Sequence, residues 1–288
     1  MMSYPTARGV YFLANNHVIE LAIAFLNSFR THNPNIPLCL IPFDDKVDKI
    51  LELRETYSFE VYENQDLLTA CDEMSAKFHG HVCGAYRKLV AWDGPFEEFV
   101  YIDTDTIVVQ PIDFVFENLA HADIFTANSN VPAMRKWVWK DSIDESTVLS
   151  REQISFAANS GFFVSKSKLL SMAYVKTKID AALELKEHME LHCMEQPLLN
   201  YLIVTSGYRY GSLLEFRKSK INRRVKHEWW AGTPGGYVRK GKFRLLFGPP
   251  IFLVHWAGVW QKDGGTLADI PYKRLWDYYR HLDLKSLK

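Results

Sequence analysis

Short, continuous apolar runs alternate with longer amphipathic stretches at the start of the chain. The runs 9–14, 37–43 and 59–62 have the character of buried strands. Between them, 17–29 has helical spacing behind an asparagine cap, and 46–56 predicts a short helix. Strands that alternate with helices are typical of a mainly parallel sheet covered by helices. The pattern therefore predicts the α/β class.

The alternation continues less regularly after residue 62. We expect a helix in the second part of 71–92, an amphipathic helix over 166–190, and a helix from 194 with Pro197 in its first turn. Further strands are expected at 99–102, 106–109, 123–127, after Gly161, and at 249–255. Segment 128–152 has weak periodicity and predicts an irregular loop or lid, a type of insertion that is often functional.

Two aspartates interrupt the apolar segment 99–109. Asp103 and Asp105 flank Thr104 where the predicted strand ends, and side chains two residues apart point to the same side. Two such carboxylates repel each other unless a cation lies between them. Mg²⁺ and Mn²⁺ prefer oxygen ligands and often share them with a substrate phosphate. A metal site is one interpretation, and a surface turn with two solvated aspartates is the other.

The composition describes an ordinary globular protein. Of the 288 residues, 48% are hydrophobic and 24% charged, and no apolar run has transmembrane length. The N-terminal residues lack the apolar region of a signal peptide, and the four cysteines form no CxxC pair. These features predict buried free thiols and a cytoplasmic protein.

The zero net charge hides a strong asymmetry. Residues 1–144 contain 11 Lys and Arg against 21 Asp and Glu, whereas 145–288 contain 23 against 13. Segment 217–244 has ten Lys and Arg and one acid, Glu228. The asymmetry predicts an anionic partner for the C-terminal half, whether a nucleotide phosphate, a lipid headgroup or a nucleic acid. The alternative is that the two oppositely charged halves dock against each other.

Taken together, several motifs of the chain resemble those of the GT-A glycosyltransferases, and most closely those of family 8. They are the first strand running into Ala14-Asn15-Asn16, the basic pair Arg87-Lys88, Asp103-Thr104-Asp105, Asn159-Ser160-Gly161, Glu195-Gln196, and His255 with Gly258 and Lys262. The resemblance covers residues 9 to 262 and implies a single GT-A domain. Its parts are a nucleotide-binding half (1–127), a donor-sugar and acceptor half (128–262), and a basic, aromatic tail (263–288).

The resemblance implies a metal-dependent glycosyltransferase that uses a nucleotide-sugar, commonly a UDP-sugar. Asp103, Asp105 and His255 would bind Mn²⁺ or Mg²⁺. Glu195 and Gln196 would be the catalytic pair beside the sugar, and the anomeric configuration would be retained. The remaining positions would contact the donor: Ala14, Asn15, Asn16, Arg87, Lys88, Thr104, Asn159, Ser160, Gly161, Gly258 and Lys262.

Two positions depart from the family pattern. Lys262 lies seven residues after His255, where the family has six, and Gln261 occupies the expected place. Glu195 stands where the family usually has aspartate, which keeps the charge and adds one methylene.

The resemblance also implies an acceptor, which would be a saccharide or a lipid-linked sugar. The basic C-terminal half would allow peripheral contact with the inner membrane face.

Three alternatives remain at this stage. A sugar-phosphate nucleotidyltransferase shares the α/β pattern, but it usually has a glycine-rich basic loop after its first strand, where this chain has Asn15-Asn16-His17. Asp103-Thr104-Asp105-Thr106 comes close to the Asp-x-Asp-x-Thr motif of a class of phosphatases, but the second threonine is not at the required place, and that motif normally sits near the start of the domain. A nucleic-acid-binding protein could use Trp229, Trp230 and Tyr237 among the cations, but the acidic N-terminal half disfavours it.

Overall fold

A mixed seven-stranded sheet forms the centre of the molecule. The computed structural model describes residues 6–222, 225–259 and 267–284. The strand order is β3-β2-β1-β4-β7-β6-β8. All neighbouring pairs are parallel except the two that involve β7. The bounds are β1 Thr6–Ala14, β2 Leu38–Pro42, β3 Phe59–Val61, β4 Phe96–Ile102, β6 Ile124–Thr126, β7 Phe162–Lys166 and β8 Tyr210–Ser212. The predicted mainly parallel α/β sheet is confirmed.

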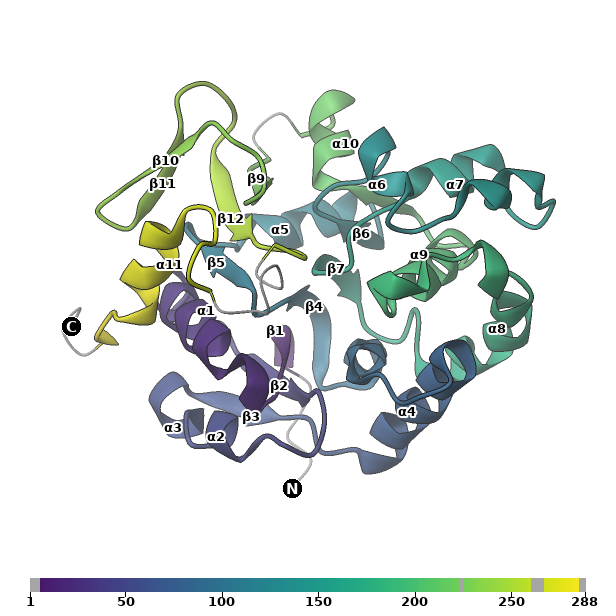
Figure 1. Cartoon of the computed structure of the whole chain (residues 1–288), viewed down its shortest axis with the longest axis horizontal. Helices are drawn as coiled ribbons and strands as arrows, with labels where there is room; N and C mark the ends of the chain where they lie inside the picture. The colour runs from purple at the N-terminus through teal and green to yellow at the C-terminus, as the bar shows by residue number, and fades with distance from the viewer. Residues whose placement is uncertain (1–5, 223–224, 260–266, 285–288) are drawn as a thin grey trace.

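Strand β1 separates two apolar cores. Val10 and Phe12 belong to one core and Tyr11 and Leu13 to the other, because successive side chains of a strand point to opposite faces. Helix α1 (Ile19–His32) covers the first core, and α4 (Gln65–His79), α8 (Met172–Glu184) and α9 (Gln196–Val204) cover the second. Figure 1 shows these two layers on either side of the central strands.

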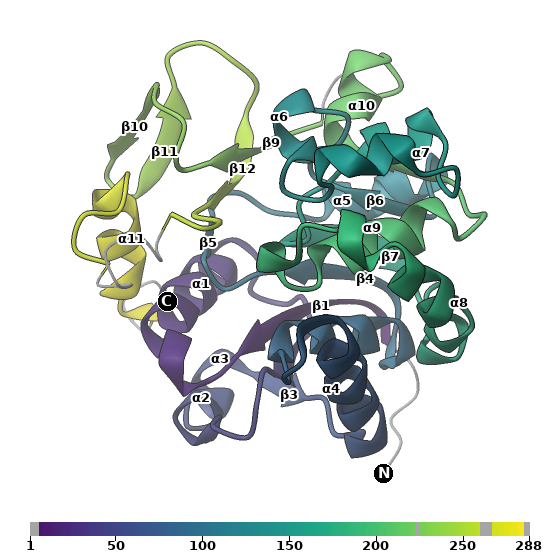
Figure 2. The same ribbon diagram turned by 45° about the vertical axis from the view of Figure 1, so that its right-hand side comes forward.

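A second sheet crosses the carboxyl end of the central strands. It has the order β5-β12-β9, with bounds Thr106–Val108, Ile251–His255 and His227–Trp230. Strand β12 pairs antiparallel with β5 and parallel with β9. An antiparallel hairpin, β10 (Gly236–Arg239) and β11 (Lys242–Leu245), lies at the edge of the molecule in Figures 1 and 2.

The last helix packs on the first. Helix α11 (Lys273–Arg280) buries Leu275, Trp276 and Tyr279 in a third core that includes part of α1. Asn27 of α1 donates to the Tyr279 carbonyl at 2.8 Å. The described part of the basic, aromatic tail is therefore part of the folded domain.

Several predicted helices differ in extent. The expected helix at 46–56 is two short ones, α2 (Asp48–Leu51) and α3 (Arg54–Tyr57). The helix expected late in 71–92 is instead a 3₁₀ helix, η2 (Gly84–Asp93), which is preceded by α4. The predicted helix 166–190 is shorter, since β7 includes Lys166 and α8 begins at Met172.

Segment 128–152 is more ordered than its sequence indicates. It contains α6 (Pro132–Arg135) and a 3₁₀ helix, η4 (Asp141–Glu145), and it leads into α7 (Arg151–Phe156). Val138 and Trp139 are buried in the core, which fixes the middle of the segment. Apolar anchors spaced irregularly give no periodic signal, so the expected loop is a series of short helices. The remaining described elements are helices α5 (Phe114–Glu117) and α10 (Leu213–Lys218) and the short 3₁₀ helices η1 (Asn16–Val18), η3 (Asn118–Ala120), η5 (Lys186–His188) and η6 (Leu191–Cys193).

All four cysteines are free, with Cys39 and Cys71 buried and Cys83 and Cys193 half-buried, so the expected burial applies to only two of them. None of the helices in the described ranges combines the length and apolar character that crossing a bilayer requires.

Candidate functional site

Asp103 and Asp105 lie in the connection between β4 and β5. Strand β4 ends at Ile102 and β5 begins at Thr106, so the carboxylates leave the buried sheet at its carboxyl end. The Asp103 amide donates to the Gly161 carbonyl at 2.8 Å, and the Thr106 hydroxyl donates to the Asp103 carbonyl at 2.7 Å. These backbone contacts fix the loop. The prediction that the aspartates stand where the strand emerges is confirmed.

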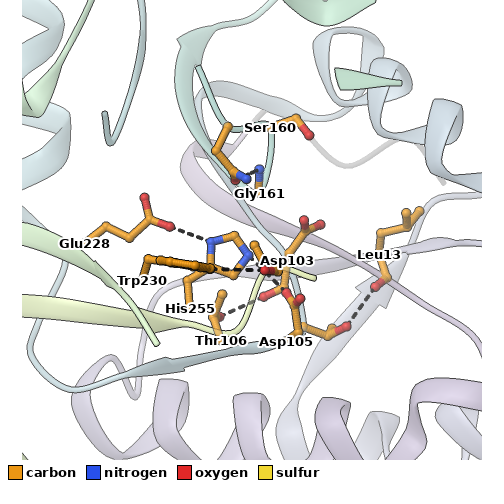
Figure 3. A network of polar contacts seen from close by, with 12 residues as sticks. Leu13, Asp103, Asp105, Thr106, Ser160, Gly161, Glu228, Trp230 and His255 are labelled. Atoms are coloured by element: carbon orange, nitrogen blue, oxygen red, sulfur yellow. Dashed lines mark hydrogen bonds and ion pairs between the residues drawn. The ribbon is translucent and has the colours of Figure 1, made fainter. Parts of the chain in front are cut away.

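His255 joins the two aspartates from the last residue of β12. One ligand atom from each of Asp103, Asp105 and His255 lies within 4.8 Å of the others. His255 is 2% exposed, its Nε2 is 3.2 Å from Asp105 Oδ1, and its Nδ1 is 2.5 Å from Glu228 Oε1. Figure 3 shows the imidazole between these two carboxylates. Burial alone lowers the pKa of His255, but Asp105 and Glu228 outweigh it and hold the pKa well above its ordinary value.

The donor set and the space around it fit a hard divalent cation. Two carboxylates and an imidazole are common ligands of Mn²⁺. Glu228 is hydrogen-bonded to Nδ1 of His255, the ring nitrogen that faces away from the aspartates, so Nε2 remains on the side of the candidate site. A Cβ at Gly161 would lie 2.4 Å from His255 Cε1 and 2.8 Å from Asp103 Oδ2. Only glycine leaves this space open. The residues present are therefore suited to hold a metal.

Lys88 connects the aspartate loop to a second group of polar residues. Its ammonium lies 3.0 Å from Asp103 Oδ1 and 2.6 Å from Glu195 Oε1, and the residue is 5% exposed. Burial lowers the pKa of Lys88, but Asp103 and Glu195 reverse the effect and raise it above its ordinary value. Tyr101 also donates to Asp103, at 2.6 Å. A cation buried between two acids holds them at a fixed separation.

Ser160 binds both members of the Glu195-Gln196 pair at the start of α9. Its hydroxyl donates to Glu195 Oε1 at 2.7 Å, and its amide donates to Gln196 Oε1 at 3.0 Å. The Gln196 amide nitrogen donates in turn to the Trp137 carbonyl at 2.7 Å. Asn159 accepts a bond from the Gly161 amide at 2.7 Å, which forms the turn before β7. The structure thus brings 159–161 together with 195–196, as the sequence analysis expects.

The end of β1 lies on the other side of the aspartate loop. Ala14 is buried, and the Thr104 hydroxyl is 3.4 Å from the Leu13 carbonyl beside it. Asn15 donates to Asp44 at 2.7 Å, and Asn16 donates to Asp48 at 2.6 Å. The two asparagines therefore hold the loop after β2 against the loop after β1.

Arg87 occupies a different place from its neighbour Lys88. Its guanidinium makes a bidentate pair with Asp72 of α4, at 2.8 and 2.5 Å, and contacts the Pro42 carbonyl at 3.2 Å. Both residues are expected from the family resemblance to contact the donor, but each side chain already neutralises an internal carboxylate. Gly258 has a left-handed φ of +67°, and none of the described residues would lie within 4 Å of a Cβ added there. Lys262 lies outside the described residues.

Three residues at the site were not identified from the sequence. Glu228 is the single acid of the basic segment 217–244, and this is the feature of the sequence that could have identified it. Tyr101 lies two residues before Asp103 on the same side of β4, so its spacing could have been recognised. Trp230 is paired with His255 in the β9–β12 register, lies beside it in Figure 3, and is 49% exposed.

Comparison with known proteins provides structural relatives only. No protein-family model matches the chain, and no curated protein matches its sequence. Three similar solved structures are glycosyltransferases: the bifunctional enzyme WbbM (13% identity, TM-score 0.60), GlyE of Streptococcus pneumoniae TIGR4 (13%, 0.55), and the galactosyltransferase LgtC with donor and acceptor sugar analogues (11%, 0.56).

The extent of these matches differs. The alignments cover 99% of this chain and 51% of WbbM, 98% and 62% of GlyE, and 94% and 95% of LgtC. The chain therefore spans about half of WbbM and nearly all of LgtC. At identities this low, the matches establish a shared architecture and nothing finer. The chain has the GT-A-like fold of these glycosyltransferases.

Proposed function

We propose that this protein is a metal-dependent glycosyltransferase that moves a sugar from a nucleoside-diphosphate sugar to a saccharide or lipid-linked acceptor. The observation that carries the proposal is the cluster of Asp103, Asp105 and His255. It stands at the carboxyl end of a central strand, where ligands of open α/β sheets bind. The cluster lies within a fold shared with glycosyltransferases, which supports this reaction over the nucleotidyltransferase and nucleic-acid-binding alternatives.

Asp103, Asp105 and His255 would hold Mn²⁺ or Mg²⁺. Such a cation supplies charge neutralisation for the departing nucleoside diphosphate. Gly161 leaves the space that the ion and a phosphate need, and Glu228 fixes the orientation of His255. We assign the base and ribose, with UDP as the expected nucleotide, to Ala14, Asn15, Asn16 and the backbone of Thr104.

The transferred sugar would lie between the metal ligands and the start of α9. Asn159, Ser160, Glu195 and Gln196 line that side. Glu195 is held by Lys88 and Ser160, so its carboxylate is oriented before substrate arrives. Gly258 and Lys262 would cover the diphosphate. The order of these motifs is that of glycosyltransferase family 8, which supports retention of anomeric configuration.

Thermal unfolding with nucleotides tests the proposal directly. We expect UDP or a UDP-sugar with Mn²⁺ to raise the melting temperature, because a ligand that binds only the folded state stabilises it. Neither the nucleotide alone nor Mn²⁺ with adenosine should give the same shift. The Asp105→Ala variant should lose the metal-dependent part, and the exposed Asp180→Ala should behave like wild type.

Product analysis separates the reaction classes. Incubation of the responding nucleotide-sugar with the protein and Mn²⁺ should release nucleoside diphosphate. Release should be slow when the sugar is transferred to water and faster when an acceptor is present. Release of pyrophosphate from a nucleoside triphosphate and a sugar phosphate would instead establish a nucleotidyltransferase. Proton NMR of the first-formed glycoside should show the anomer of the donor. No response to any nucleotide, with or without metal, would refute the proposed function.

A further inference from the structure

The β10–β11 hairpin has two chemically different faces. In its register Tyr237 pairs with Arg244 and Arg239 pairs with Lys242, and all four side chains are exposed. The alternate positions, Val238 with Phe243, face inward. The outer face therefore carries three cations and one aromatic ring, and Lys240 adds a fourth cation at the turn.

These four cations lack acidic partners within the described part of the chain. Among the residues that the structure describes, no ion pair joins Arg239, Lys240, Lys242 or Arg244 to an acid. Arg239 and Lys242 stand directly opposite each other, an arrangement that destabilises an isolated sheet. An anionic partner outside the protein would relieve this repulsion.

An apolar pair directly follows the cationic face. Leu246 is 74% exposed and Phe247 is 95% exposed, the two most exposed large apolar side chains of the described residues. Gly248, with φ +139°, and then Pro249 and Pro250 follow. Gly248 supplies a φ that other residues rarely adopt, and the two prolines fix their own φ and so restrict the chain that follows the apolar pair.

The hairpin is fixed to the domain from its inner side. Phe243 packs edge-on against Tyr272, with ring centroids 5.1 Å apart, and lies 5.9 Å from the ring of Trp229. The Gly236 amide donates to the Tyr272 hydroxyl at 3.2 Å. These contacts set the orientation of the hairpin relative to β9 and to the candidate site at β12.

We propose that this hairpin and the 246–247 tip bind the surface of an anionic lipid bilayer. The side chains of Arg239, Lys242 and Arg244, together with Lys240, would contact lipid phosphates. Leu246 and Phe247 would enter the boundary between headgroups and acyl chains. Nucleic acid matches the charge but offers no apolar environment for an aliphatic side chain such as Leu246. The apolar tip therefore favours lipid.

The described part of the C-terminal tail is a weaker candidate for the same surface. Trp276 and Tyr279 of α11 are buried against α1, and Arg280 is paired with Glu20. The membrane contact that the sequence analysis attributes to the whole basic half is thus narrowed to residues 237–247.

Co-sedimentation of the full chain with vesicles tests the proposal. We expect the protein to bind phosphatidylcholine vesicles containing phosphatidylglycerol at low salt, to leave them at about 0.5 M salt, and not to bind pure phosphatidylcholine. One cation contributes roughly fivefold to partitioning, so Arg239→Gln/Lys242→Gln/Arg244→Gln should lower it roughly a hundredfold. Leu246→Ser/Phe247→Ser should lower it at least tenfold, and Phe247→Trp should preserve it.

Matched controls remove the same groups elsewhere. Lys77→Gln/Lys140→Gln/Lys176→Gln deletes three exposed cations, and Val82→Ser deletes an exposed apolar side chain. Both should bind vesicles like wild type, as should Asp105→Ala, which separates this surface from the metal site. Equal binding to neutral and anionic vesicles would overturn the proposal. So would wild-type binding by the hairpin variants, or binding of a single-stranded oligonucleotide without any vesicle binding.

Discussion

Glu228 Oε1 lies 2.5 Å from His255 Nδ1, on the side of the imidazole opposite Asp105. The other Glu228 oxygen accepts a bond from Asn128 at 3.2 Å. One carboxylate therefore orients the His255 ring and links β9 to the segment after β6. Outer partners of this type keep a ligating histidine in the required orientation and tautomer.

Removal of the Glu228 carboxylate should weaken metal binding. We expect Glu228→Ala to raise the dissociation constant for Mn²⁺ roughly ten- to hundredfold, because His255 loses the partner that orients it. Glu228→Gln keeps an oxygen that can accept from Nδ1 and should lose less. The electron paramagnetic resonance signal of free Mn²⁺ measures both. The exposed Glu187→Ala is the control, and wild-type affinity in Glu228→Ala would contradict a positioning function.

A methyl group at Gly161 should close the space between the metal ligands. The added carbon would meet His255 Cε1 at 2.4 Å and Asp103 Oδ2 at 2.8 Å, so both side chains must move. We expect Gly161→Ala to lose about 1–3 kcal/mol of unfolding free energy and the Mn²⁺-dependent thermal shift.

Gly207→Ala is the matched control for that variant. Gly207 has φ +80°, so alanine is strained there, but open space surrounds the added carbon. This variant should lose stability and keep the Mn²⁺ response. An intact response in Gly161→Ala would show that the cation does not occupy the space beside this glycine.

The sequence was sufficient for the central strands other than β8 and for the two aspartates of the candidate metal site. Buried strands such as β1 and β4 are continuous apolar runs, and charge directly after such a run marks the edge of a sheet. Asp103 and Asp105 could therefore be placed from local pattern. The association of His255 with them came from the family resemblance, because nothing local to residue 255 reports a partner about 150 residues earlier.

The sequence was less informative for short, half-exposed strands and where pairing over long distances determines the structure. Strand β9 pairs with β12 much later in the chain, and the cations of β10 and β11 hide the alternation of that hairpin. Lys88 shows the same limit for side chains. The family resemblance implies a donor contact for it, whereas its actual partners, Asp103 and Glu195, become neighbours only when η2, β4 and α9 assemble. Charge alone does not distinguish an internal ion pair from a ligand contact.

Replacement of Lys88 should expose how strongly the buried acids depend on it. Lys88→Met leaves Asp103 and Glu195 close together without their cation, so we expect a loss of about 3–5 kcal/mol in urea unfolding. A second change, Glu195→Gln, should recover part of that loss because one unpaired charge is removed. Lys166→Met is the control. It breaks a half-exposed pair with Asp123 and should cost about 1 kcal/mol or less. Equal losses in the two lysine variants would contradict a buried, coupled cation.

His227 should make the protein less stable in mild acid. Burial and the nearby Arg217 lower its pKa from 6.5 to about 4, and its Nε2 is buried with no hydrogen-bond partner among the described residues. Since the unfolded chain binds this proton more readily than the folded one, the contribution is complete above about pH 6.5 and is lost as the pH falls toward 4. Urea unfolding of wild type and His227→Gln at pH 7.5 and 5 measures the effect. We expect wild type to lose more free energy of unfolding than the variant over this interval. The exposed His81→Gln should keep the wild-type pH dependence, and a wild-type dependence in His227→Gln would assign the acid sensitivity to another group.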